Sequence, residues 1–171
     1  MKTNYVLTIK AEDRPGLLHL LTGVLNKKLI PIISLSAAST DISDIVLVTM
    51  EVEISEKALA PLLAKLKNII EVFAADAVPY DQVLCVRAAY FKMARPFLES
   101  PQMQVLQKYS AVIVNTYPDG VLIAKYGTDA AIRTVYNELE GPYLIGFSQT
   151  GVIAESSLIG GDESSVISLA A

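Results

Sequence analysis

The chain has 171 residues, which is enough for one domain or for two small domains that each bury a core. Its hydrophobic fraction is 52%, yet no run approaches the roughly 18 uninterrupted apolar residues of a membrane-spanning helix. The net charge is −4 and the 14 basic residues are scattered, which argues against a nucleic-acid or anionic-membrane surface. The apolar excess instead predicts faces shared with other copies of the chain or with a protein partner.

The first 80 residues predict the element order β-α-β-β-α-β. Helical spacing of apolar residues predicts two helices, one after the Pro15-Gly16 turn and one after Ser55, a predicted N-cap. In the strand before Ser55, Glu51 and Glu53 lie on the face opposite the apolar residues, where we expect solvated charge. Alternating or apolar segments predict the four strands: residues 5–10, 31–40, 45–54 and 71–80.

The second half predicts the same order again, with little sequence identity between the halves. Helices are expected after Ser100-Pro101 and after Thr128-Asp129, and "YPDG" predicts a hairpin turn. We therefore predict an α+β chain of two tandem ferredoxin-like βαββαβ domains, residues 1–80 and 81–158, and a flexible tail, residues 159–171. The strands expected in the second half are residues 82–91, 111–116, 121–126 and 143–154.

Residues with catalytic chemistry are few. His19 is the only histidine, and no cysteine or carboxylate stands at metal-ligand spacing from it. Cys85 lies in an apolar strand, which predicts a buried, inert thiol and allows no internal disulfide. No glycine-rich phosphate-binding motif follows a strand. We predict no catalytic residue and no metal site, and the absence of a signal-peptide pattern near the start predicts a cytoplasmic protein.

The stretch "EDRPGLLHLL" (residues 12–21) suits the binding of an amino acid. Backbone N–H groups at the start of a helix can hold a carboxylate, and Gly16 would let a ligand approach them. Asp13 could accept a hydrogen bond from an ammonium group. We expect ligand contacts at Asp13, Gly16 and Leu17, although Pro15 and Gly16 could equally serve only to start a helix packed tightly on the sheet.

The segment "YVLTIKAEDRPGLLHLLTGVLNKKLIPIISLSAAST" resembles an ACT domain, a βαββαβ module that binds amino acids at subunit interfaces. Together with "GPYLIGFSQTGVIAES", in which Thr150 and Gly151 match the family's closing triplet, it resembles the small regulatory subunits of acetolactate synthase. That resemblance implies an N-terminal ACT domain and a C-terminal ACT-like domain, over the chain up to about residue 157.

Four residues depart from this family's pattern. Leu29 and Pro31 replace a glycine and a ligand-holding asparagine after the first helix, and proline offers neither a side-chain amide nor an N–H. Asp13 stands where asparagine is common, and Gln149 replaces the arginine of the closing triplet. These changes leave open whether valine or another molecule is the effector.

The resemblance implies a regulatory subunit without catalytic activity, forming at least a homodimer and acting in branched-chain amino acid biosynthesis. It would bind and activate the large catalytic subunit, and amino-acid binding would alter that activity. Thiamine diphosphate, magnesium and FAD would belong to the catalytic subunit, and this chain would hold no cofactor. Two other interpretations remain open: a free-standing tandem-ACT amino-acid sensor or transcriptional regulator, and a structural dimerisation module.

Overall fold

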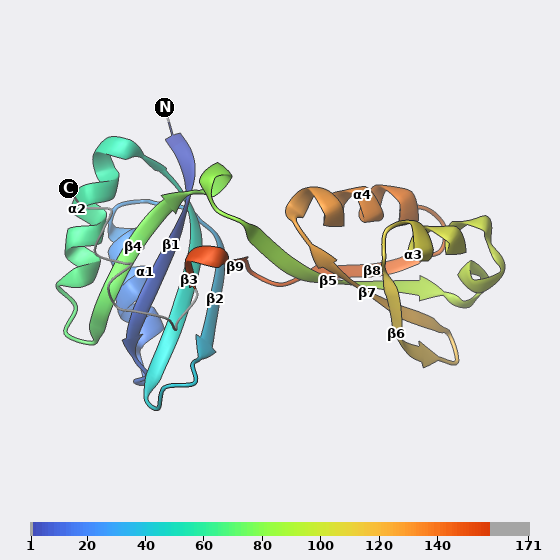
Figure 1. Cartoon of the computed structure of the whole chain (residues 1–171), viewed down its shortest axis with the longest axis horizontal. Coiled ribbons are helices and arrows are strands. Elements are labelled where there is room, and N and C mark those ends of the chain that lie inside the picture. The colour runs from blue at the N-terminus through green and yellow to red at the C-terminus, as the bar shows by residue number, and fades with distance from the viewer. Residues whose placement is uncertain (1, 158–171) are drawn as a thin grey trace.

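The computed structural model describes residues 2–157, which form two antiparallel sheets, each covered by helices on one face (Figure 1). This is the α+β architecture of two tandem ferredoxin-like units that the sequence predicts. The predicted tail, residues 159–171, lies outside the described residues. No helix of residues 2–157 is both long enough and apolar enough to cross a membrane.

The first sheet has the strand order β2-β3-β1-β4, with β1 paired to both β3 and β4. All six elements predicted for this half are present and in the predicted order. Ser55 occupies the N-cap position of α2, although its side chain accepts no capping hydrogen bond. The elements are β1 (Lys2–Glu12), α1 (Leu17–Lys27), β2 (Ile32–Ser39), β3 (Ile45–Ser55), α2 (Glu56–Lys67) and β4 (Val72–Pro79).

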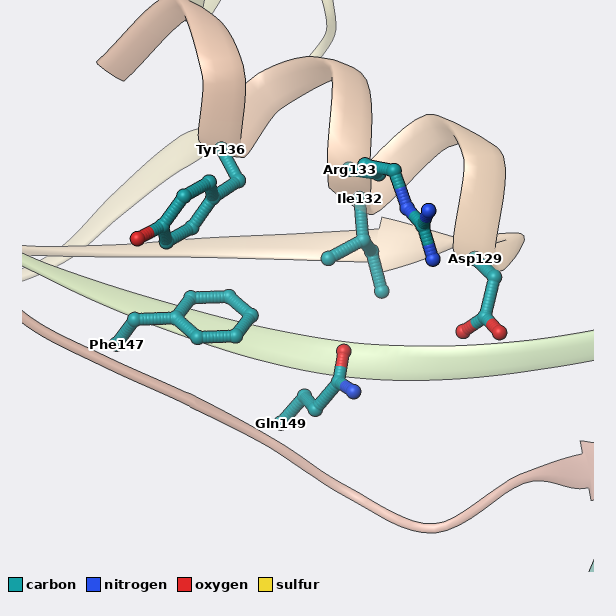
Figure 2. A pocket seen from close by; sticks show the side chains of 6 residues that line it. All are labelled: Asp129, Ile132, Arg133, Tyr136, Phe147 and Gln149. Carbon is teal, nitrogen blue, oxygen red and sulfur yellow. The ribbon is translucent and has the colours of Figure 1, made fainter. Parts of the chain in front are cut away.

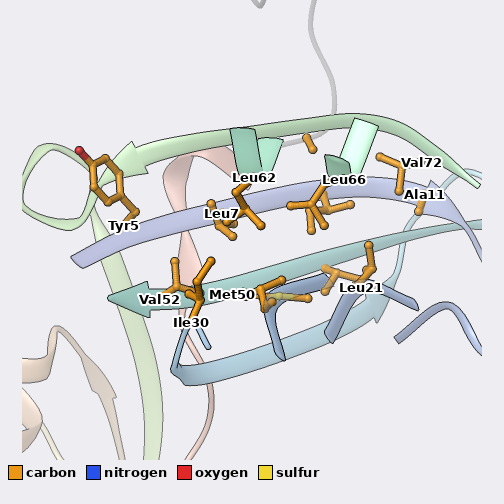
Figure 3. Close-up of a cluster of buried hydrophobic side chains, with 14 of the residues drawn as sticks. Tyr5, Leu7, Ala11, Leu21, Ile30, Met50, Val52, Leu62, Leu66 and Val72 are labelled. Atoms are coloured by element: carbon orange, nitrogen blue, oxygen red, sulfur yellow. The ribbon is translucent and has the colours of Figure 1, made fainter. Parts of the chain in front are cut away.

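Both helices of this half pack on the same face of the sheet and enclose its core (Figure 3). Alternate residues of β1 and β3 point to this face because side chains alternate along a strand. The buried residues of α1, which face the sheet, recur every four positions, as in an amphipathic helix. The core side chains with no exposed surface include Leu7, Ile9, Leu21, Leu25, Met50, Leu62 and Leu66.

Part of the opposite face of the first sheet is covered by the other half of the chain. Val6 of β1 is fully buried there, in a cluster with Cys85, Val152 and Ala154. The last described segment therefore returns from the second sheet and packs on the first (Figure 1).

The second sheet has the order β6-β7-β5-β8, and the short β9 pairs with the start of β5. Its core lies between this sheet and the helical segments, with Phe91 and Phe97 fully buried. A 3-10 turn (Tyr80–Gln82) links the two halves. The strands and α-helices are β5 (Cys85–Ala94), α3 (Gln104–Lys108), β6 (Val112–Tyr117), β7 (Gly120–Gly127), α4 (Asp129–Leu139), β8 (Leu144–Gln149) and β9 (Ile153–Ala154).

Local signals in the second half are confirmed at the hairpin and at α4. β6 and β7 pair through the predicted "YPDG" turn, with Tyr117 opposite Gly120. Thr128 is the N-cap of α4, and its hydroxyl accepts a hydrogen bond from the N–H of Ala131 at 3.3 Å.

Two predictions for this half need correction. The helix expected after Ser100 is short: it begins as a 3-10 turn (Pro101–Met103) and continues as the five-residue α3, and the Ser100 hydroxyl donates to the Phe97 carbonyl instead of capping. The final strand is broken between β8 and β9. A β-carbon on Gly151 would lie only 3.0 Å from the carbonyl oxygen of Leu35, so the chain makes a close contact with β2 at this break.

Candidate functional site

Helix α1 starts at a glycine in the left-handed conformation. Gly16 is its N-cap, with φ of 89° and ψ of −8°, a backbone geometry that residues with a β-carbon adopt only with strain. No atom would meet a β-carbon there within 4 Å, so backbone conformation, and not crowding, explains the glycine. The sharp turn places the first turn of α1 beside the ends of β2 and β3.

A pocket of about 230 Å³ lies at this turn. The predicted binding residues Asp13, Gly16 and Leu17 all line it. Sequence reasoning missed the contributions of Ala37 from β2 and Val46 from β3, because strand pairing, and not spacing along the chain, brings them to the helix. The remaining lining residues are Arg14, Leu18 and His19.

This pocket contains both acidic and basic side chains. Asp13 is exposed, and its carboxylate forms no ion pair with any residue in 2–157. Arg14 pairs with Glu12 at 2.8 Å. Leu18 and His19 belong to the first helical turn, whose N–H groups lack intrahelical partners. An anion near these N–H groups and a cation near Asp13 would both be favoured.

The family departures after α1 fall outside the pocket lining. Leu29 has a φ of 55° and is 90% exposed, so it occupies a left-handed position that a glycine would adopt without strain. Pro31 is also exposed and does not line the pocket. The pocket described here thus consists of residues before and within α1 and on the neighbouring strands.

A second constellation joins the two sheets through Arg87 of β5. Its Nη2 donates to Glu51 Oε2 on β3 at 2.5 Å, and its Nε donates to Asp129 Oδ1 at the start of α4, also at 2.5 Å. Its Nη1 donates to the Thr150 carbonyl at 3.2 Å. One guanidinium therefore binds three segments that are distant in sequence.

The expectation that Glu51 is a solvated surface charge is wrong. Glu51 and Arg87 are each only 4% exposed. The side of β3 that carries Glu51 is covered by the second half of the chain, a long-range contact that strand periodicity does not reveal. Glu53 does lie near the surface, 3.8 Å from Lys2. Cys85, as predicted, is buried, and burial followed by the charge of Glu51 raises the pKa of its thiol.

Arg87 keeps its charge in this setting. Burial by itself lowers the pKa of a guanidinium, but the hydrogen bonds and charges of Asp129 and Glu51 outweigh it, so the pKa of Arg87 is raised. The three groups form a hydrogen-bonded network in which a buried cation faces two carboxylates. We assign this network to the joining of the two halves of the chain.

The pKa of Tyr80 is raised because its side chain borders the same network. Its hydroxyl donates to Asp129 Oδ2 at 3.2 Å, and burial, followed by the charge of Asp129, raises its pKa from 10.0 to about 12. The folded state therefore holds this proton more tightly than the unfolded state, so the Tyr80 contribution is constant below pH 10 and is lost as pH rises toward 12.

We expect Tyr80→Phe to reduce the loss of stability between these two pH values, as measured by denaturant unfolding across the range. Tyr126→Phe, at a side chain that is 62% exposed, is the matched control. Equal pH profiles for wild type and Tyr80→Phe would contradict the assignment. The phenolate absorbance of the wild type should likewise show one tyrosine ionising near pH 12.

Residues 2–157 contain no group of three or more histidine, cysteine, aspartate or glutamate side chains placed to hold a metal ion. His19 is exposed at the α1 pocket.

Comparison with known proteins gives a strong match in structure alone. No family model matches the sequence. No curated protein matches it either. Among solved structures, the chain is similar to the acetolactate synthase small subunit from Thermotoga maritima, with a TM-score of 0.80, 14% identity, and coverage of 88% of this chain and 95% of that chain.

Two further matches have lower TM-scores. The regulatory subunit of aspartate kinase from Thermus thermophilus has a TM-score of 0.41 at 15% identity, over 81% of this chain and 95% of that chain. A putative glycine cleavage system transcriptional repressor has a TM-score of 0.41 at 14% identity, over 90% and 98%. The first match extends over nearly the whole of both chains, so this chain has the two-domain fold of the acetolactate synthase small subunit.

Proposed function

We propose that the chain is a non-catalytic regulatory subunit, which binds and activates the large catalytic subunit of an acetolactate synthase in branched-chain amino acid biosynthesis. The observation that carries this proposal is the similarity of fold to an acetolactate synthase small subunit along nearly the full length of both chains. The sequence resemblance over the first 40 residues and at Thr150-Gly151 supports the same family. Thiamine diphosphate, magnesium and FAD would reside on the catalytic subunit.

The α1 pocket is the proposed site of a small amino-acid effector. Asp13 would accept from the ammonium group, and the N–H groups of the first α1 turn would receive the carboxylate. Gly16 leaves the backbone accessible, and Leu17 would contact the aliphatic part. An effector that prefers one arrangement of the subunits would shift the population of the complex by its differential affinity.

Activation can be tested with purified proteins. The chain is added to a purified acetolactate synthase catalytic subunit, and acetolactate formation from pyruvate is followed. We expect turnover to rise with chain concentration to a plateau, and the chain alone to be inactive. A catalytic rate independent of the chain, without complex formation in sedimentation, would overturn the partner assignment. A chain that still responded to amino acids would then be a free-standing sensor.

Effector binding gives a separate prediction. A ligand that binds only the folded state, at about 100 times its dissociation constant, adds about 2.7 kcal/mol to the free energy of unfolding, enough to raise the melting temperature by several degrees. We expect such a shift with at least one free amino acid. Ala37→Leu should abolish it, because the larger side chain enters the pocket from β2.

Ala38→Leu is the matched control, since Ala38 is the exposed neighbour on β2 and does not line the pocket. If no amino acid shifts the melting temperature, the effector assignment fails while the partner assignment stands. If both variants keep the shift, the ligand lies elsewhere.

A further inference from the structure

A larger pocket, of about 320 Å³, lies between α4 and β8, on the second half of the chain (Figure 2). Its volume is at the lower end of the range for small-molecule sites. It shares no residue with the α1 pocket. The lining residues are Asp129, Ile132, Arg133, Tyr136, Phe147 and Gln149.

One end of this pocket is aromatic. The rings of Tyr136 and Phe147 lie edge to face, with centroids 5.0 Å apart, and Phe147 leaves 40% of its surface exposed. Phe91 lies opposite Phe147 on the neighbouring strand β5 and packs against it, with ring centroids 5.1 Å apart. The rings therefore offer a fixed apolar surface that an aromatic or aliphatic group could cover.

The other end of the pocket is polar and carries an unmatched positive charge. Figure 2 shows the Arg133 guanidinium on the same side as Asp129 and Gln149, away from the two rings. Asp129 is already engaged, because its two carboxylate oxygens accept from Arg87 and Tyr80. Arg133 forms no ion pair with any carboxylate in residues 2–157.

From this arrangement we propose that the α4–β8 pocket binds a small carboxylate that bears an apolar or aromatic group. The ligand carboxylate pairs with Arg133, whose planar guanidinium suits two parallel hydrogen bonds to it. The apolar group lies against Phe147, Tyr136 and Ile132, and the Gln149 amide adds a polar contact at the carboxylate end.

The state of Asp129 also predicts which carboxylates bind. Because Arg87 already supplies a positive charge beside Asp129, an α-ammonium group on the ligand gains less from Asp129 than it would from a carboxylate without an ion-pair partner. The site should therefore take a carboxylate without an amino group about as well as the corresponding amino acid. The α1 pocket, with its unpaired Asp13, is expected to require the amino group.

Phenylpropanoate and phenylalanine test this directly, because they differ only by the α-amino group. We expect saturable binding of phenylpropanoate to the full chain by titration calorimetry, and binding of phenylalanine at this pocket of similar strength. Arg133→Gln should weaken both by at least about tenfold, the usual effect of losing a hydrogen bond to a charged group. Arg133 is exposed, so this variant should fold normally.

Arg95→Gln is the matched control, since Arg95 is also exposed, does not line the pocket, and its guanidinium donates to the Pro118 carbonyl at 3.3 Å. Backbone amide NMR shifts locate the ligand, with changes expected at Tyr136, Phe147 and Gln149. Phenylpropanoate binding that is unchanged in Arg133→Gln, shifts confined to Gly16 and Leu18, or no binding at all would each overturn the proposal. None of these readouts uses the catalytic subunit, so failure of the pocket proposal would leave the proposed regulatory function unaffected, and the reverse also holds.

Discussion

Replacing Arg87 by methionine is expected to lower the free energy of unfolding by about 3–5 kcal/mol, the usual cost of removing one partner of a buried ion pair. The cost arises because Glu51, which is 4% exposed, would be left charged without a counter-ion. Methionine fills much of the same volume, so the lost free energy of unfolding comes mainly from charge and hydrogen bonding and less from packing. Urea unfolding at neutral pH measures it.

The matched control for this variant removes both charges. Glu51→Leu combined with Arg87→Met leaves two apolar side chains at the same site and should recover most of the lost stability. Asp129→Asn should cost less than Arg87→Met, because the Asp129 side chain is 38% exposed and can be hydrated. A loss below about 1 kcal/mol for Arg87→Met would mean that the pair behaves as a surface ion pair.

The same substitution should loosen the contact between the two halves of the chain. Arg87 is the group through which β3 of the first sheet meets the start of α4, and the buried cluster around Val6 lies nearby on the same sheet face. Hydrogen exchange is therefore expected to quicken at Val152 and Ala154 in Arg87→Met before it does so in either sheet. Unchanged exchange at these two residues would mean that the network contributes to stability but does not hold the two halves of the chain together.

Patterns within a few residues predicted most of the fold correctly. Alternation identified β1 and β3, and spacings of three and four identified α1, because these strands and this helix each bury one face. The hairpin turn at "YPDG" and the Thr128 cap are also local signals, and both are present.

The features that sequence reasoning missed depend on contacts between segments far apart in the chain. Glu51 has the position of a solvated strand residue, and only the packing of β5 on β3 makes it a buried ion-pair partner. The break before β9 reflects the close approach of Gly151 to Leu35. Similarly, the sequence predicted the α1 contribution to the first pocket, whereas Ala37 and Val46 come to it through sheet register.

Leu21→Ala is the other substitution with a large expected effect, a loss of about 2–5 kcal/mol in the stability of the first half. Leu21 has no exposed surface and packs α1 against the sheet, so truncation leaves a cavity that the surrounding strands fill only in part (Figure 3). Leu20→Ala makes the same chemical change at the adjacent residue of the same helix. Leu20 is 45% exposed, so its loss should stay within about 0.5 kcal/mol.

Native-state hydrogen exchange is the appropriate measurement, because a chain with two cores need not unfold in one step. Exchange of β1 and β3 amides should accelerate in Leu21→Ala, while β5 and β7 amides change little, since the two sheets have separate cores. Equal acceleration in both sheets would show that the halves unfold together. The α1 pocket depends on how this helix is seated, so Leu21→Ala should also weaken any amino-acid response that Leu20→Ala retains.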